Sequence, residues 1–346
     1  MSWYLYLGTI FFYVLTRLYG VAADVSMEEQ QLVSELGRQD PVAAAKHVLK
    51  FDGILNPFQL PWHFTNIISG TGDEAQVPWA RGAQYNSDPW ALGLYQTGYL
   101  YIPQEFGNFV LKRTSLFSEK DRKNATAPFY STKSYNPKKI ERVIIVLPGQ
   151  WRNSWTYINM MGNALNVAYK YPELKVKEDS VLILSPMFFN QKDRDSGSVK
   201  NNEISFHDAG WSAGGSVREP REFKHISSFD VLDSMIDMVM DKSKFPNLKN
   251  VVIAGHSMGG QMALHYVMTK KSMSYDDKIS YWVGDPGAYT YLSSSRPFST
   301  KNCDNYNDWP YSITNVASLP NYAQNHAGPN GSHLEAVSYT HLTLPT

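Results

Sequence analysis

Two five-residue segments of the chain have the spacing Gly-x-Ser-x-Gly, which is typical of a turn that presents a nucleophilic serine. One is Gly-His-Ser-Met-Gly at 255–259, and the other is Gly-Trp-Ser-Ala-Gly at 210–214. A serine in such a turn can attack an ester or amide carbonyl and form a covalent acyl-enzyme. Three fixed residues also occur together by chance, so the flanking sequence has to distinguish the two segments.

The flanking sequence favours Ser257 as the nucleophile. The chemistry needs a strand, a sharp turn and a helix, because this arrangement exposes the hydroxyl and aims the helix N-terminus at the developing oxyanion. An apolar run at 250–254 precedes Ser257, and a helical pattern at 258–270 follows it. Ser212 follows a polar run and precedes a Gly- and Pro-containing stretch instead. We therefore predict that Ser257, and not Ser212, is the nucleophile.

Two backbone N–H groups are candidates for stabilising the oxyanion. The first belongs to Met258, the residue after the nucleophile. The second belongs to Gln150, in the loop 148–151 that follows the apolar run 143–147. Gly149 allows the backbone to turn at this point. The alternative interpretation of this loop is an ordinary strand-to-helix turn.

The catalytic acid and histidine are expected after the serine along the chain. Asp285 follows the apolar run 279–283 and is a candidate acid at the carboxyl edge of the sheet, with a turn-forming Asp-Pro-Gly as the alternative. Asp276 and Asp277 precede the same run, so we expect them at the opposite edge. His256 is adjacent to the nucleophile in a tight turn, and we expect it to pack or to support the site residues rather than act as the base.

Three histidines near the C-terminus, at positions 326, 333 and 341, lie in a segment without a buried strand. The last nine residues, 338–346, resemble a translated cloning or sequencing adaptor. We expect residues 324–346 to be a non-native tail and the last strands of the sheet to be missing. None of these histidines would then be the base, and this copy of the chain would be inactive.

The elements around the candidate site alternate between strands and helices. Four apolar runs indicate strands buried on both faces, at 143–147, 181–184, 250–254 and 279–283. Three helical patterns follow the first three runs, at 155–170, 229–239 and 258–270. This alternation predicts an α/β fold, a mostly parallel sheet with helices on both faces. An aromatic-rich segment at 286–323 indicates a cap insertion able to line an acyl pocket.

The N-terminal part of the chain indicates secretion. Residues 1–23 resemble a signal peptide, with an apolar run and small residues before a cleavage site; an uncleaved membrane anchor is the alternative. Asn124 begins a glycosylation sequon. Residues 24–140 indicate an N-terminal extension. It is expected to contain a helical region at 26–52, a β-hairpin at 99–116 and a surface loop at 118–140. The core is expected at 141–323.

Composition narrows the class of partner. Apolar residues make up 43% of the chain and charged residues 18%, so a substantial core is expected. The formal net charge is zero without a Lys/Arg-rich run, which makes nucleic acid an unfavourable partner. We predict a small-molecule ester or acyl substrate, no metal, no organic cofactor and no membrane span after signal cleavage. The single cysteine, Cys303, is either a buried inert thiol or one that has lost its partner.

Five segments together resemble a group of secreted fungal α/β-hydrolase-like proteins. They read Leu-Pro-Gly at 147–149, Ser-Pro-Met-Phe-Phe-Asn at 185–190, Ser-Ser-Phe-Asp-Val-Leu-Asp at 227–233, Gly-His-Ser-Met-Gly-Gly-Gln-Met at 255–262 and Asp-Pro-Gly-Ala-Tyr at 285–289. The likeness covers about 141–323 and implies an α/β-hydrolase fold with Ser257 in the position of the nucleophile of a serine esterase.

The chain departs from this resemblance at two places. Pro148 stands where related hydrolases often have a histidine before glycine, at the start of the loop that carries Gln150. The segment that carries the acid and the base of the group is absent, so neither residue can be transferred. The rival interpretation is a non-catalytic binding protein on the same fold, because a fold does not determine a function.

Overall fold

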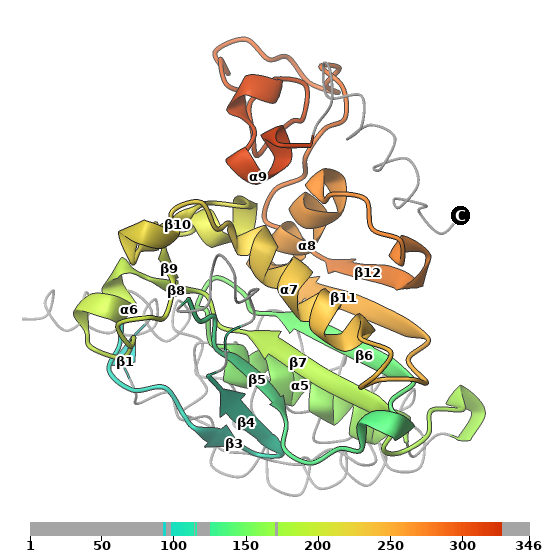
Figure 1. Ribbon diagram of the computed structural model, residues 1–346. Coiled ribbons are helices and arrows are strands. Elements are labelled where there is room, and N and C mark those ends of the chain that lie inside the picture. Colours follow the sequence, from blue (N-terminus) through green and yellow to red (C-terminus); the bar gives the residue numbers. More distant parts are fainter. Residues whose placement is uncertain (1–92, 95–97, 114, 116–124, 170–171, 327–346) are drawn as a thin grey trace, which may run out of the picture. The chain divides into compact units, whose positions relative to one another are not determined.

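The computed structural model of the chain describes residues 93–94, 98–113, 115, 125–169 and 172–326 (Figure 1). Several expectations fall outside these residues: the signal peptide 1–23, the helical region 26–52, the sequon at Asn124, and His333 and His341 in the C-terminal tail.

The chain divides into two compact units. One consists of Met1–Trp90 with Asn163–Lys175, and the other of Ala91–Gly162 with Val176–Thr346. In the first unit, the described residues hold the last part of helix α5 (Ser154–Ala168) and a short 3-10 helix at Pro172–Leu174. The second unit contains the sheet and all the candidate site residues that the structure describes.

A seven-stranded sheet forms the centre of this second unit. Its strands in chain order are β3 (Glu105–Phe106), β4 (Phe109–Lys112), β5 (Phe129–Thr132), β6 (Arg142–Leu147), β7 (Val181–Pro186), β11 (Asn250–His256) and β12 (Ile279–Gly284). Their order across the sheet is β12-β11-β6-β7-β5-β4-β3. The first four of these are mutually parallel, and β5, β4 and β3 continue the sheet antiparallel. The mostly parallel sheet predicted from the sequence is confirmed.

The parallel strands are the four apolar runs of the sequence. Every residue of β7 is buried, as expected of a strand covered on both faces. Neighbouring strands are in register at their carboxyl ends, with Gly255 opposite Leu147 and His256 opposite Gly284. Loops that follow β6, β11 and β12 therefore leave the sheet at the same edge.

The antiparallel part of the sheet differs from the sequence-based expectation. The hairpin partner of β4 is β3 at 105–106, whereas the sequence indicated a strand at 99–102. The predicted surface loop at 118–140 is wrong for 129–132, which form β5 between β4 and β7. Phe129 and Tyr130 are buried there. The four-residue run is too short to show a period, so only its sheet neighbours identify it as a strand.

Helices cover both faces of the sheet. α7 (Ser228–Met240) and α8 (Met258–Thr269) lie on one face, and the part of α5 that belongs to this unit, 154–162, lies behind the sheet in Figure 1. These three helices confirm the predicted helical patterns to within two residues at each end. On the α5 side, Trp155 makes edge-to-face contacts with Tyr99 and Tyr130. No helix among the described residues is long and apolar enough to cross a bilayer.

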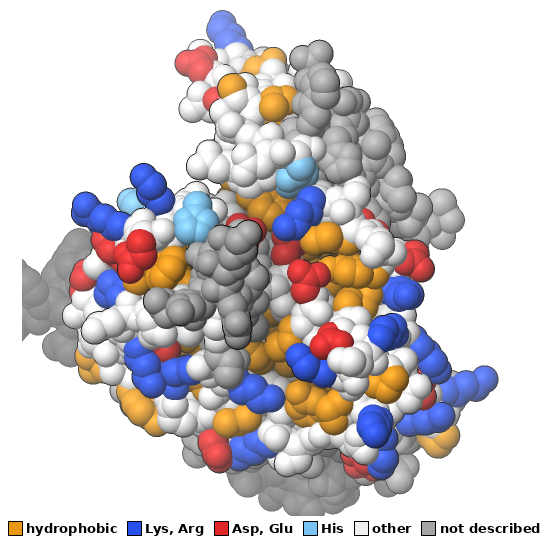
Figure 2. Space-filling view, in the orientation of Figure 1, with side chains coloured by type: hydrophobic (Ala, Val, Ile, Leu, Met, Phe, Trp, Pro, Cys, Tyr) orange, Lys and Arg blue, Asp and Glu red, His pale blue; other side chains and the backbone are white. Residues whose placement is uncertain are grey.

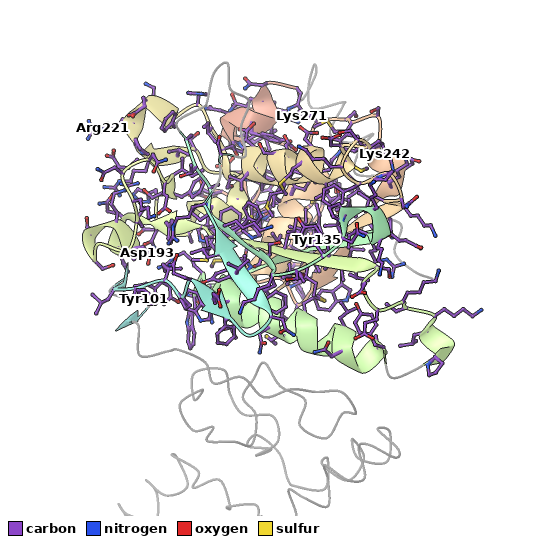
Figure 3. All side chains as sticks on the ribbon, turned by 60° about the horizontal axis from the view of Figure 1, so that its bottom comes forward. Tyr101, Tyr135, Asp193, Arg221, Lys242 and Lys271 are labelled. Carbon is purple, nitrogen blue, oxygen red and sulfur yellow. The ribbon has the colours of Figure 1, made fainter. Side chains whose placement is uncertain are left out.

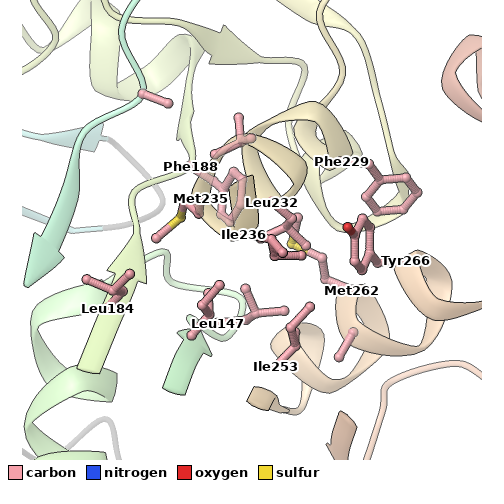
Figure 4. Packing of buried hydrophobic residues seen from close by; sticks show 14 of the residues in the cluster. Leu147, Leu184, Phe188, Phe229, Leu232, Met235, Ile236, Ile253, Met262 and Tyr266 are labelled. Atoms are coloured by element: carbon pink, nitrogen blue, oxygen red, sulfur yellow. The ribbon is translucent and has the colours of Figure 1, made fainter. Parts of the chain in front are cut away.

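The main hydrophobic core lies between the sheet and the helices α7 and α8 (Figure 4). Alternate residues of the strands face this core, such as Leu147 of β6, Leu184 of β7 and Ile253 of β11. Leu232 from α7 and Met262 from α8 pack against them. Burying each such side chain contributes about 1.5–3 kcal/mol, so the core holds the helices that flank Ser257 in fixed positions.

Shorter elements complete the second unit. A two-stranded sheet contains β1 (Gly93–Leu94) and β2 (Gly98–Tyr99). A three-stranded sheet contains β8 (Phe189–Asn190), β9 (Ser205–Phe206) and β10 (Val217–Glu219). The short helices are α6 (Gln191–Asp195) and α9 (Asn321–Gln324), together with 3-10 turns at Pro137–Lys139, Gly210–Ala213, Arg221–Phe223, Asp276–Lys278 and Val316–Ser318.

Candidate active site

Ser257 stands at an abrupt bend between β11 and α8. β11 ends at His256 and α8 begins at Met258, while Ser257 itself has φ 55° and ψ −123°. A non-glycine residue in this region of backbone space is strained and persists only where its surroundings hold it. The Ser257 N–H donates to the Gly284 carbonyl over 3.0 Å, and its carbonyl accepts from the Gln261 N–H over 2.9 Å. The geometry that the sequence predicted at residue 257 is present.

The glycines around Ser257 are required by close backbone contacts. A Cβ atom on Gly255 would lie 2.1 Å from the Gly259 carbonyl oxygen, and one on Gly259 would lie 2.6 Å from that of Leu147. Neither approach is sterically possible for a larger residue. The same contacts place the first turn of α8 directly against the end of β6, where the loop with Gln150 begins.

The second Gly-x-Ser-x-Gly segment has a different structure. Ser212 lies in the 3-10 helix Gly210–Ala213, is 2% exposed, and donates its hydroxyl to the Ala209 carbonyl over 2.9 Å. No strand enters this segment, and its serine is neither accessible nor strained. Ser212 therefore lacks the geometry of a nucleophile.

The two predicted oxyanion donors lie at the same edge of the sheet. Met258 is the first residue of α8, and the first intrahelical bond of that helix runs from Gln261 to Ser257. The N–H of Met258 therefore has no acceptor within the helix, and the positive end of the helix dipole is at this point. Gln150 is exposed and lies in a turn in which the Arg152 N–H donates to the Gly149 carbonyl over 3.0 Å.

The candidate acid Asp285 directly follows β12 and is exposed, with a φ of 43°. It lies at the carboxyl edge of the sheet, next to the Gly284 carbonyl that accepts the Ser257 N–H. Its role as the acid stays a prediction. Asp276 and Asp277 form the 3-10 turn before β12, at the opposite edge as expected.

None of the described histidines is hydrogen-bonded to Ser257. His256 is exposed. His265 is buried on α8, where its Nδ1 is 2.8 Å from the Ser212 carbonyl oxygen and burial lowers its pKa to about 4. His326 Nε2 lies 2.6 Å from the Thr269 carbonyl oxygen, at the end of α8 remote from Ser257.

Several aromatic side chains of the 286–323 segment are exposed. Tyr289 is 65% exposed and Phe298 85% exposed. Arg296 lies between two aromatic rings, 3.9 Å from the ring centre of Tyr291 and 5.2 Å from that of Tyr306. The segment begins close to the site, because a Cβ atom on Gly287 would lie 3.1 Å from the side-chain oxygen of Gln261 on α8.

Two further features bear on chemistry and partners. Cys303 is exposed, so the interpretation as a buried thiol is wrong. No group of three metal-ligating side chains occurs in the part of the chain that the structure describes. Acidic and basic side chains are interspersed over the face shown in Figure 2, in keeping with the zero net charge.

Sequence reasoning missed the residues that hold the Gln150 turn. A buried ion pair joins Arg152 to Asp193, and the Tyr99 hydroxyl donates to the Trp151 carbonyl over 2.6 Å. Arg152 and Asp193 are 41 positions apart, and neither belongs to a recognisable motif. The loop itself was recognised from the sequence only because residues 148–151 directly follow a predicted strand.

The strand order, the helices on both faces and the bend at Ser257 define the α/β-hydrolase fold. No protein-family model and no curated protein matches the chain. Solved structures with similarity to it include poly(aspartic acid) hydrolase-1 from Sphingomonas sp. KT-1, at 18% identity and a TM-score of 0.33 over 62% of this chain and 79% of that one.

Two further structures are similar at the same level. LpqC, a poly(3-hydroxybutyrate) depolymerase from Bordetella parapertussis, has 14% identity and a TM-score of 0.31 over 67% of this chain and 75% of its own. The siderophore hydrolase EstA from Aspergillus nidulans has 12% identity and a TM-score of 0.30 over 52% and 57%. At these scores the fold assignment rests on strand order and on the bend at Ser257.

Proposed function

We propose that this protein is a serine hydrolase of the esterase or lipase type that acts through an acyl-enzyme at Ser257. The observation that carries the proposal is the strained backbone of Ser257 between a core strand and a helix. Such strain is characteristic of functional sites, and here it holds a half-buried hydroxyl at the carboxyl edge of the sheet. Among the described residues, that hydroxyl makes no hydrogen bond that would occupy it.

The reaction follows from the position of the donors. Ser257 Oγ attacks the carbonyl carbon of the ester while its proton passes to a histidine base, and the N–H groups of Met258 and Gln150 stabilise the negative oxygen of the tetrahedral intermediate. The proton then passes to the departing alkoxide, which leaves as an alcohol. Water hydrolyses the acyl-enzyme by the same steps. Asp285 is the candidate partner of the base.

The proposed substrate class is based on the aromatic side chains after Asp285, and the proposed location is based on the N-terminal sequence. Exposed aromatic side chains in the segment after Asp285, such as Tyr289, favour a small ester with an apolar acyl or alcohol group. Residues 1–23 and the sequon at Asn124 favour secretion of a glycosylated protein, with an anchor formed by residues 1–23 as the alternative. N-terminal sequencing of secreted material distinguishes them, because cleavage gives a chain that starts at Asp24.

A second candidate function is a non-catalytic binding protein on the same fold. The observation in its favour is that no described histidine is hydrogen-bonded to Ser257. Without a base, acylation would be slower by several orders of magnitude. The Ser257 turn would then serve only to shape a binding surface.

The test compares hydrolysis of a short-chain p-nitrophenyl ester by the native protein and by two variants. Because residues 324–346 are expected to be non-native, the product of the native gene is assayed beside the 346-residue chain. Ser257→Ala should reduce kcat/KM at least about a thousandfold, because the nucleophile is lost. Ser212→Ala removes the serine of the other motif and should leave kcat/KM within about twofold.

Three outcomes are informative. Loss of activity in Ser257→Ala alone supports the proposal. Equal activity in Ser257→Ala and the unaltered protein would rule out an acyl-enzyme at this residue. A folded native-gene product without any esterase activity would favour the binding protein instead.

A further inference from the structure

The turn that carries Gln150 contains a backbone donor without an acceptor among the described residues. The Arg152 N–H closes the turn on the Gly149 carbonyl over 3.0 Å, which leaves Gln150 and Trp151 as its two central residues. Gln150 is exposed, and its N–H makes no hydrogen bond within the described part of the chain. The direction of this N–H is therefore determined by whatever holds the turn.

A buried ion pair fixes the C-terminal end of the turn. Arg152 is 4% exposed and Asp193 is fully buried. Arg152 Nε donates to one carboxylate oxygen of Asp193 over 3.0 Å, and Nη2 donates to the other over 2.9 Å. This two-point contact fixes the orientation of the guanidinium plane as well as its position. The backbone of Arg152 is in the left-handed region, at φ 60°.

Asp193 is itself held on two sides. The Tyr99 N–H donates to one of its oxygens over 3.2 Å, and the Asn190 N–H donates to the other over 3.0 Å. Each carboxylate oxygen thus accepts two hydrogen bonds, which compensates the cost of burying the charge. In Figure 3, Asp193 lies on the same side of the unit as Tyr101, where the strand of Tyr99 contacts α6.

Tyr99 makes a second contact with the turn. Its hydroxyl donates to the Trp151 carbonyl over 2.6 Å. Its ring packs edge-to-face on Trp155 at 4.9 Å between ring centres. The carbonyl of a central turn residue is therefore tied to a ring that is packed against α5.

We propose that Tyr99, Arg152 and Asp193 are positioning residues that hold the Gln150 N–H in place for the oxyanion. The inference rests on the proposed function, because only an acyl-transfer reaction makes use of that donor. An oxyanion donor is effective when it is held in place before the reaction, and a small displacement weakens it in the transition state more than in substrate binding. Loss of the support should therefore lower kcat more than it raises KM.

Tyr99→Phe is the variant that tests this inference. It removes only the hydroxyl that holds the Trp151 carbonyl and keeps the ring on Trp155. Substitution of Arg152 or Asp193 would leave a buried charge unpaired, and the protein could fail to fold. Tyr130→Phe is the matched control, since Tyr130 also packs edge-to-face on Trp155 but donates its hydroxyl to the Pro103 carbonyl, away from the turn.

The measurements are steady-state kinetics on a p-nitrophenyl ester and hydrogen–deuterium exchange of the peptide that spans 147–153, both on the native-gene product. Tyr99→Phe should lower kcat about tenfold with KM within about twofold, and should speed exchange in this peptide. Tyr130→Phe should change neither the kinetics nor that exchange rate. Circular dichroism confirms that both variants are folded.

The readouts separate failure of this inference from failure of the proposed function. Unchanged exchange at 147–153 in Tyr99→Phe overturns the inference whatever the activity. Faster exchange with unchanged kcat in an active enzyme also overturns it, because the turn would then move without effect on catalysis. An inactive but folded unaltered protein overturns the proposed function, and this inference with it.

Discussion

At the scale of single residues, the candidate site is defined by a backbone conformation and by close backbone contacts that most residue types do not tolerate. Ser257 takes a conformation that few residues adopt, and Gly255 and Gly259 leave no space for a Cβ atom. These are the three fixed residues of the Gly-x-Ser-x-Gly motif, and the two glycines are fixed because the turn has no space for a side chain at their positions. Ser212 meets the same pattern in a 3-10 helix with its hydroxyl already bonded, which shows that the pattern alone is insufficient.

His265 predicts how stability depends on pH. Its pKa is lowered from 6.5 to about 4, chiefly because burial disfavours the charged ring. Between these values the unfolded chain binds a proton that the folded chain does not, so stability falls as pH decreases from about 6.5 to about 4. The loss from this group is on the order of 3 kcal/mol.

Denaturant unfolding at several pH values measures this effect. His265→Gln should have a smaller slope of the free energy of unfolding against pH in this window. His225→Gln, at an exposed histidine, should keep the slope of the unaltered protein. An identical slope in His265→Gln would show that this ring is not the group responsible.

At the scale of elements, α7 begins with a capping box. The Ser227 hydroxyl accepts from the Phe229 N–H over 3.1 Å, and Asp230 accepts from the Ser227 N–H over 2.8 Å. The next residue, Ser228, is buried with a hydroxyl that has no hydrogen-bond partner in the described part of the chain. The Ser227 hydroxyl therefore stabilises the start of α7, whereas the buried Ser228 hydroxyl does not.

Thermal and chemical unfolding of two variants tests this difference. Ser227→Ala should lower the free energy of unfolding by about 1–2 kcal/mol, because the cap is lost. Ser228→Ala should be neutral or stabilising, because it removes an unsatisfied buried hydroxyl. Equal destabilisation by both substitutions would contradict the hydrogen bonding described at this helix start.

The elements that the sequence predicted are those with a strong local signal. The parallel strands and the helices α5, α7 and α8 are recognisable because apolar runs and helical periods are properties of a single segment. β5 was missed because its place between β4 and β7 depends on partners distant in sequence. The Arg152–Asp193 pair was missed for the same reason: nothing local to either residue shows the contact.

At the scale of the whole molecule, the fold determines where the candidate site residues lie. Parallel strands in register bring the ends of β6, β11 and β12 to one edge, so Gln150, Ser257 and Asp285 are gathered there although they are far apart along the chain. The common edge was predictable from the parallel strands expected in the sequence, whereas the order of the strands across the sheet was not. A histidine base was not predictable in the same way, and no described histidine is hydrogen-bonded to Ser257.

The central claim is that Ser257 is the nucleophile, and the most direct measurement locates a covalent adduct. The native-gene product is treated with a fluorophosphonate, digested, and analysed by mass spectrometry. The account predicts one adduct, on Ser257, which is lost in Ser257→Ala. An adduct on Ser212 or another residue, with the Ser257 peptide unmodified, would contradict it.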